Sequence, residues 1–381
     1  MKYFTVIDYN TEPTLFNVRF TSLDFIEILY DKGIYLAELK QPDHLVQDYS
    51  HKMMWVITDI DVVQYYSLLD PATYTTFGLP MQRNKFITAI LAENNMLDEL
   101  KIAHNQGFLW DEKTTIAANG HLECLKYAHE NGCVITKRTL IEAVINDNYD
   151  CVKYLIEQKC RWSAKTCKKA AQYGRLRCLI LLHESNCPWD ERTCKVASRN
   201  GHLDCLMYAH EKGCPWNKST CKNAVMSDEL ECLKYAHQNG CEMEEELSVV
   251  AVRNGSIRCL IYCKEHGCQW DEVLCEIASE AGNLGCLRLL HNAHCPWDED
   301  SCNAAALNGK IHCLQFLHDN KCKWDSNTCY YAAKNGHLDC LKYAHENHCP
   351  WNINTCLIAV FNGHKECAAY AKENRCSWIF R

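Results

Sequence analysis

The chain has 381 residues and a formal net charge of -8 at pH 7, and no apolar run approaches the ~20 residues that a membrane-spanning helix needs. The negative balance gives no global positive field that would attract nucleic acid or an anionic membrane surface, so we expect neither as a partner. The stretch from Met1 to Asp8 is too short, and becomes acidic too soon, for a secretory signal peptide.

Residues 1–82 are richer in aromatic and β-branched residues than the rest of the chain and predict a small N-terminal α/β domain. Ser22 can cap a helix that runs through Tyr30, and Asp61 can cap a second one that runs towards Leu69. The dipeptide Asp70-Pro71 is typical of a break between elements. Four stretches have the composition of strands: Lys2–Ile7, Phe16–Phe20, Ile34–Leu39 and Met53–Thr58.

Residues 83–381 form a second region, which repeats with a period of 27 residues. Such a period indicates a stack of similar units instead of a single globular core. Tryptophan falls on this grid at Trp162, Trp189, Trp216, Trp270, Trp297, Trp324, Trp351 and Trp378, with Met243 at the remaining position. Turn residues recur at the same interval, at Gly120, Asp147, Gly174, Gly201, Asp228, Gly255, Gly282, Gly309, Gly336 and Gly363. With a first turn near Asn95, these positions predict eleven helix pairs.

The unit that starts at Cys187 shows why each repeat predicts two helices. Asp190 is suited to cap a first helix, Gly201 supplies a turn that needs a positive φ, and Gly213 ends a second helix. Each helix has only about ten residues and would be marginally stable alone, so stacking has to stabilise it. The second helix carries an apolar stripe at helical spacing, formed by Cys205, Leu206 and Ala209.

Cysteine is unusually abundant, with 28 residues, and all but Cys263 fall on three columns of the repeat. A unit has the form Cys-x6-Cys-x10-Cys, whereas structural zinc sites favour pairs two to four residues apart and four ligands. We therefore predict that the thiols pack as small buried hydrophobes in a reducing compartment and hold no metal. Disulfides between stacked helices are not expected, because packed helices lie about 8–10 Å apart. The spacing leaves a Cys194–Cys205 bridge within one unit open.

Tryptophan and histidine columns predict packing in preference to chemistry. Eight indoles in register are typical of stacking platforms for single-stranded nucleic acid, but acidic caps flank them where a binding groove would carry Lys or Arg. We expect partly buried indoles between repeats. A catalytic histidine needs one singular constellation, whereas these recur on the second helices at His129, His210, His237, His318 and His345.

The segment Gly336-His337-Leu338-Asp339-Cys340-Leu341-Lys342-Tyr343-Ala344-His345-Glu346-Asn347 resembles the second helix of an ankyrin repeat. Thr193-Cys194-Lys195-Val196-Ala197 resembles a shortened form of the ankyrin Thr-Pro-Leu-His-x-Ala motif. The Cys-Pro-Trp-Asp form and the stretch Gly33-Ile34-Tyr35-Leu36 are similar to the large ankyrin-repeat families of giant DNA viruses of the mimivirus type. The common ankyrin unit has 33 residues, and the shorter unit here lacks the projecting hairpin. The resemblance implies an ankyrin-like α-solenoid, mostly α, that acts as an interaction scaffold.

Two rows of residues that vary between units share one face of the first helices, four residues apart. One row is Lys168, Lys195, Lys222, Val249, Glu276, Asn303, Tyr330 and Leu357. The other is Gln172, Arg199, Met226, Arg253, Glu280, Leu307, Lys334 and Phe361. Variable residues on a regular stack either determine its specificity or vary without constraint. On the first alternative, the partner-binding residues on this concave face are Lys168, Lys195, Lys222, Glu276, Tyr330 and Phe361.

The leading hypothesis is a non-enzymatic protein–protein interaction scaffold without cofactors, monomeric and cytoplasmic, in the host cell if the protein is viral. An alternative is a substrate adaptor for a ubiquitin ligase that acts through the N-terminal domain, although no F-box-like segment is visible there. A third hypothesis is a metal- or redox-sensing cysteine array. No phosphate-binding glycine loop and no serine elbow points to an enzyme.

Overall fold

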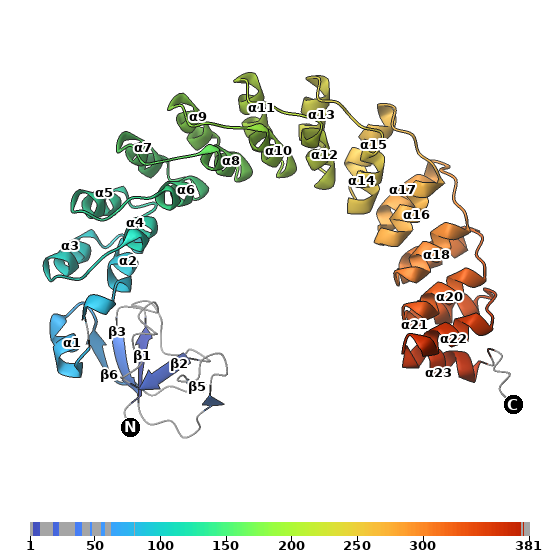
Figure 1. Ribbon diagram of the computed structural model, residues 1–381, viewed down its shortest axis with the longest axis horizontal. Helices are drawn as coiled ribbons and strands as arrows, with labels where there is room; N and C mark the ends of the chain where they lie inside the picture. Colours follow the sequence, from blue (N-terminus) through green and yellow to red (C-terminus); the bar gives the residue numbers. More distant parts are fainter. Residues whose placement is uncertain are drawn as a thin grey trace. The chain divides into compact units, whose positions relative to one another are not determined.

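The computed structural model describes residues 3–7, 18–22, 35–39, 46–47, 55–57, 62–79, 81–374 and 376. They form two compact units. The first contains the strands and the helices up to α7, together with α9, and the second contains the helix pairs from α10 onward (Figure 1). Helix α8 belongs to both units, because the boundary falls after Ala170.

Six described strands make one antiparallel sheet in the order β4-β5-β2-β1-β3-β6. Their bounds are β1 Tyr3–Ile7, β2 Val18–Ser22, β3 Tyr35–Leu39, β4 Val46–Gln47, β5 Trp55–Ile57 and β6 Val62–Ser67. The four predicted strands are confirmed, the second of them displaced towards Ser22. The helix expected from Ser22 to Tyr30 lies outside the described residues. Helix α1, Pro71–Phe77, follows the sheet and contacts the segment just before α2, where Asn84 Nδ2 donates a 2.8 Å hydrogen bond to the Tyr74 hydroxyl.

The helix predicted from Asp61 to Leu69 is wrong. These residues form β6, which pairs with β3 and places Leu36 opposite Tyr66. The pairing is a long-range contact that a capping signal does not reveal, and the valines and tyrosines of this stretch suit a strand. Asp70-Pro71, predicted as a break between elements, also begins α1. The Asp70 carboxylate accepts a hydrogen bond of 2.9 Å from the backbone N–H of Ala72, and Pro71 is the first residue of the helix.

Eleven helix pairs follow, as predicted, and a short 3₁₀ turn, Met81–Arg83, precedes them. The first helices are α2 Phe86–Glu93, α4 Glu112–Ala117, α6 Lys137–Ile145, α8 Ala164–Gln172, α10 Glu191–Arg199, α12 Ser219–Met226, α14 Leu247–Asn254, α16 Glu272–Ala281, α18 Glu299–Leu307, α20 Ser326–Lys334 and α22 Ile353–Phe361. The second helices are α3 Leu97–Asn105, α5 Leu122–Glu130, α7 Tyr149–Glu157, α9 Leu176–Glu184, α11 Leu203–Glu211, α13 Leu230–Gln238, α15 Ile257–Glu265, α17 Leu284–Asn292, α19 Ile311–Asp319, α21 Leu338–Glu346 and α23 Lys365–Glu373. In the second unit the first helices pack against one another in one row and the second helices in another (Figure 1). The helical repeat behind an N-terminal sheet confirms the predicted fold class.

The predicted caps and turns define each pair. The Asp190 carboxylate accepts from the backbone N–H of Arg192 at 3.1 Å, and Asp325 caps α20 in the same way. Asp271 is an exception and makes no capping hydrogen bond. Every predicted turn residue has a positive φ, and at Gly336 the turn is also crowded. A Cβ there would lie 2.5 Å from His364 Nδ1 of the next pair.

The core between pairs consists of small side chains from both helices. In α11 the predicted stripe of Cys205, Leu206 and Ala209 is fully buried, and all 26 free cysteines are buried. The loop cysteine after each second helix lies against the first helix of its own pair. The Cys187 sulfur, for example, donates to the carbonyl oxygen of Ser163, just before α8, at 3.6 Å. The other loop thiols that are not in the disulfide donate to the equivalent carbonyl oxygen of their own pair at 3.0–3.9 Å. The packing role predicted for cysteine is confirmed.

Among the described residues the structure has one disulfide, and it lies within a helix pair, so the expectation of no disulfide between stacked helices is not contradicted. Cys356 of α22 is bonded to Cys376, the loop cysteine that follows α23, and their Cα atoms are 6.4 Å apart. The helix-to-helix distance used in the prediction does not apply, because one partner lies in a loop that folds back onto the helix. The bridge left open between Cys194 and Cys205 is not formed.

At many junctions a set of three ring side chains joins one pair to the next. The His210 ring of α11 stacks on Trp216 at a centroid distance of 3.8 Å, and His210 Nδ1 shares a 3.0 Å hydrogen bond with the Tyr235 hydroxyl of α13. The same set recurs at His318, Trp324 and Tyr343. The described indoles on the grid are half-buried, which confirms their predicted packing between repeats. Trp378 lies outside the described residues.

One pair offers a test of this aromatic contact, because Phe316 stands where most other repeats have tyrosine. His291 and Phe316 have ring centroids 5.7 Å apart, close to the 5.8 Å between His318 and Tyr343. We expect Phe316→Tyr to give His291 a hydrogen-bond partner and to raise the free energy of unfolding by about 1 kcal/mol.

Tyr343→Phe is the matched control and is expected to lower the free energy of unfolding by a similar amount. Guanidinium denaturation followed by circular dichroism measures both changes. An unchanged or lower midpoint for Phe316→Tyr would show that the hydrogen bond does not hold adjacent pairs together.

Candidate functional site on the first helices

The six predicted partner-binding residues all lie on first helices. Lys168 is on α8 and Lys195 on α10, and both are half-buried. Lys222 on α12 and Glu276 on α16 are exposed. The remaining two, Tyr330 on α20 and Phe361 on α22, line one groove. Five of the six therefore share the second unit, and Lys168 belongs to the first.

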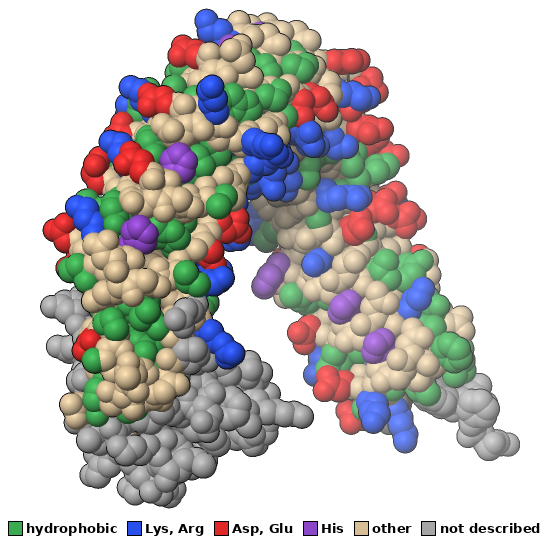
Figure 2. All heavy atoms as spheres, turned by 60° about the vertical axis from the view of Figure 1, so that its left-hand side comes forward, with side chains coloured by type: hydrophobic (Ala, Val, Ile, Leu, Met, Phe, Trp, Pro, Cys, Tyr) green, Lys and Arg blue, Asp and Glu red, His purple; other side chains and the backbone are tan. Residues whose placement is uncertain are grey.

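Charge is segregated along the first helices of the second unit. Helices α10 and α12 contribute Lys195, Arg199 and Lys222 to this face, whereas α16 contributes Glu276 and Glu280. Lys and Arg side chains gather in one cluster on the visible surface, apart from most Asp and Glu side chains (Figure 2). Burial, followed by the charges of Asp298 and Asp300, raises the pKa of the Glu276 carboxyl, as expected within a group of carboxylates. A ligand on this face would meet positive charge first and negative charge two repeats later.

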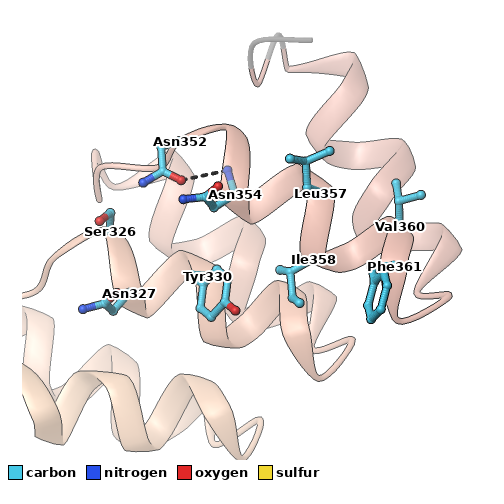
Figure 3. Close-up of a pocket in the computed structure, with 9 residues that line it drawn as sticks. All are labelled: Ser326, Asn327, Tyr330, Asn352, Asn354, Leu357, Ile358, Val360 and Phe361. Atoms are coloured by element: carbon cyan, nitrogen blue, oxygen red, sulfur yellow. Dashed lines mark hydrogen bonds between the residues drawn. The ribbon is translucent and has the colours of Figure 1, made fainter.

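The groove between α20 and α22 is apolar at its centre and has a volume of about 620 Å³. Its apolar wall is formed by Tyr330, Leu357, Ile358, Val360 and Phe361. Ile358 and Phe361 project towards the side on which Tyr330 lies (Figure 3). Polar side chains complete the rim: Ser326, Asn327, Asn352 and Asn354.

Phe361 is the most exposed large apolar side chain among the described residues. Its side chain is 87% exposed, and that of Val360 beside it is 49% exposed. Exposed apolar side chains that cluster beside polar ones are typical of protein interaction sites. The two aromatic residues that the repeat pattern singled out independently, Tyr330 and Phe361, therefore meet at one apolar groove.

The structure corrects one position of the predicted face. Asn303 of α18 is 5% exposed, and its side chain is committed to neighbours instead of solvent. Its amide oxygen accepts a 2.8 Å hydrogen bond from the Thr328 hydroxyl, and its amide nitrogen donates to Asp300 at 3.3 Å. The row of variable residues is thus interrupted between its acidic and its apolar parts.

Some groove residues escaped the sequence reasoning. Ile358 and Asn354 lie one and three positions away from Leu357, which is in the predicted row. A search for residues four apart does not select them, because they reach the groove only through the packing of α22 against α20. The sequence signal that could have found Ile358 is the long apolar run from Leu357 to Phe361.

Metal and membrane sites receive no support from the described residues. Across residues 62–79, 81–374 and 376 and the described strands, no group of three or more His, Cys, Asp or Glu side chains could hold a metal ion. In the same part of the chain, every helix is too short or too polar to cross a membrane.

Comparison with known proteins gives a related viral sequence and a number of similar solved structures. An uncharacterized protein of Acanthamoeba polyphaga mimivirus is 30% identical over 121 residues, which is 30% of this chain and 37% of that protein. The chain therefore spans little more than a third of the length of this relative. The match confirms the predicted resemblance to giant-virus proteins.

The crystal structure of the human ASB11 ankyrin repeat domain is similar to 41% of this chain and 84% of that domain, with a TM-score of 0.36 and 20% identity. No protein-family model matches the chain. The helix pairs described above recur on a regular period in this chain.

Stability measurements distinguish the open face from the core beneath it. We expect Phe361→Ser to change the free energy of unfolding by no more than about 0.5 kcal/mol, because its side chain is 87% exposed. Asn303→Ala is expected to cost about 1–3 kcal/mol, because it leaves the buried Thr328 hydroxyl without its partner. Chemical denaturation of both variants checks the assignment, and a large loss for Phe361→Ser would place Phe361 in the core.

Proposed function

We propose that the chain is a non-enzymatic protein-binding scaffold that holds its partner on the open face of the first helices. The observation that supports this proposal most directly is that Tyr330 and Phe361, which come from successive helix pairs, line the same apolar groove. Large aromatic side chains in a partly enclosed apolar site are the residues that most often dominate protein binding.

The charges on the same face define the partner further. Lys195 and Lys222 favour an acidic segment on the partner, and Glu276 favours a basic one. An apolar side chain of the partner would then enter the groove beside Phe361. Such a ligand is a polypeptide segment with acidic, basic and apolar parts in that order along the stack.

The remaining predictions about assembly belong to the same proposal. The chain acts as a monomer, and its residues 1–82 form a separate domain from residues 83–381. The ubiquitin-ligase adaptor stays a prediction, which recovery of cullin-complex subunits with the chain would favour.

Affinity purification of the full chain from expressing cells, with chemical cross-linking before lysis, tests the proposed face. We expect Phe361→Ser and Tyr330→Ser to reduce recovery of the cross-linked partner at least tenfold, because each removes an apolar contact. Lys222→Glu should reduce recovery less, and more strongly at low ionic strength.

Glu265→Lys on α15 is the matched control, since Glu265 is exposed on the row of second helices. Its recovery is expected to equal that of the unmodified chain. If the groove variants kept the partner as well as the control does, the partner would bind elsewhere and the proposed face would be wrong.

A further inference from the structure

The loop cysteines have a second cysteine beside them in eight consecutive repeats. Cys214, for example, accepts a hydrogen bond from the thiol of Cys194, which lies 20 residues earlier on the first helix of the same pair. Seven pairs have this separation: Cys167–Cys187, Cys194–Cys214, Cys221–Cys241, Cys275–Cys295, Cys302–Cys322, Cys329–Cys349 and Cys356–Cys376. The arrangement is thus a property of the repeat and not of one place in it.

One of these pairs is already a disulfide. Cys356 and Cys376 are bonded with their Cα atoms 6.4 Å apart, which is within the ~4.4–6.8 Å that a disulfide spans. The other six pairs occupy the same positions of the repeat, and their loop sulfurs contact the same capping carbonyl, at 3.3 Å for Cys214 and 3.1 Å for Cys376. The backbone arrangement that allows the Cys356–Cys376 bond therefore recurs in the other six repeats.

The eighth pair is the strongest indication that pairing matters. In α14 the helix position holds Ser248, so Cys268 lacks the usual thiol 20 residues before it. Cys263 of α15 stands beside Cys268 instead and shares a hydrogen bond with it. Cys263 is the single cysteine off the repeat grid, and other pairs have alanine or leucine at its position, as at Ala209. An extra cysteine thus occurs in the repeat whose helix cysteine is missing.

The acidities within the pairs suit thiol–disulfide exchange. The Cys221 thiol donates to the Cys241 sulfur and lowers the pKa of Cys241 to about 7. The hydrogen bonds from Cys167 and Cys275 lower the pKa values of Cys187 and Cys295 in the same way. The thiolate is the attacking species in exchange, so in these three pairs the loop cysteine is the nucleophile.

We propose that these eight cysteine pairs are dithiol–disulfide couples. Seven of them lock the first helix of a repeat to the loop that follows its second helix, and the eighth, Cys263–Cys268, locks the second helix α15 to that loop. The oxidant is a small disulfide such as oxidised glutathione. The loop thiolate attacks one glutathione sulfur and expels one glutathione thiolate. The helix cysteine then loses its proton, attacks the loop sulfur and expels the second. Each pair loses two electrons and two protons, and each oxidised glutathione gains them as two thiols.

Each of the seven bonds from a first helix would close a loop that contains the turn and the whole second helix, whereas a Cys263–Cys268 bond would close only the short segment between α15 and its loop. Closing such a loop removes conformations from the unfolded chain and stabilises the helix pair. The bonds would form within pairs, so the contacts between pairs and the open face with Phe361 keep their geometry. This inference is independent of the proposed function, since it concerns the other side of the first helices.

Thiol counting tests the proposal. The full chain is unfolded in reductant and refolded in mixtures of reduced and oxidised glutathione, so that burial does not limit access to the thiols. It is then quenched with acid, alkylated in denaturant and weighed. We expect the number of free thiols to fall in steps of two, until sixteen of the 28 cysteines are bonded. Peptide mapping should find the eight pairs named above, and the oxidised chain should unfold at a higher denaturant concentration than the reduced chain.

Variants of the chain are expected to gain or lose individual disulfide bonds. The repeat around Cys160 has Leu140 at the helix position, so Leu140→Cys is expected to add a ninth bond, to Cys160, and to leave one free thiol fewer than in the oxidised unmodified chain. Cys263→Ala should lose the bond to Cys268, and adding Ser248→Cys to that variant should restore it. Cys205→Ala, which alters a thiol of α11 outside the eight pairs, is the matched control and should leave the number of bonds unchanged.

Two results would overturn the proposal. One is a refolded chain that keeps all 28 thiols free at every glutathione ratio. The other is a peptide map in which the bonds join cysteines at random or use the α11 type of position, such as Cys205. A Leu140→Cys variant that gains no bond would contradict the recurring backbone arrangement.

Discussion

Helices of about nine residues are too short to persist alone in water, and the whole architecture depends on burying their apolar stripes against neighbouring pairs. Cys205, Leu206 and Ala209 of α11 are fully buried, and equivalent residues are buried in the repeats on either side. Because the side chains at these positions are small, the helices can approach closely. The unit can therefore be short, since it needs only enough residues to form two stripes and the turns between them.

The turns and loops carry the rest of the stabilisation. At Gly336 the backbone has a positive φ and a side chain of the next pair lies over it, so both conformation and space favour glycine. The aromatic set of His210, Trp216 and Tyr235 links one second helix to the next. The loop sulfurs connect each second helix back to its first helix. These contacts act in different directions, along the stack and within each pair, and they leave one face of the first helices free to vary.

Most helices and turns of the repeat region could be predicted from the sequence, because the same signal occurs in many units and an unclear signal in one unit is resolved by the others. The turn at Gly201, the cap at Asp190 and the half-buried Trp216 each recur about ten times, so one unit supports the interpretation of another. The N-terminal sheet has no such redundancy. The stretch after Asp61 has a capping signal and strand-forming residues together, and only its pairing with β3 decides between them.

The candidate site was predictable only in part, for a related reason. A row of variable residues identified Tyr330 and Phe361, but not that α18 buries Asn303 between the acidic and apolar parts of the face. The pairing of Cys356 with Cys376 depends on how a loop folds back, which residue spacing does not reveal. Side-chain burial and loop paths are set by neighbouring repeats, and they differ where the repeat sequence departs from its average.

The central claim, that each helix pair is stable only through its neighbours, is tested most directly by hydrogen exchange on a chain with one destabilised pair. Leu233 of α13 is fully buried, and α13 packs against both α11 and α15. Leu233→Ala should remove about 2–5 kcal/mol of packing. We expect amide protection to fall in α11 and α15 as well as in α12 and α13. Protection lost from α12 and α13 alone would contradict the claim, because it would show that the pairs are stable independently.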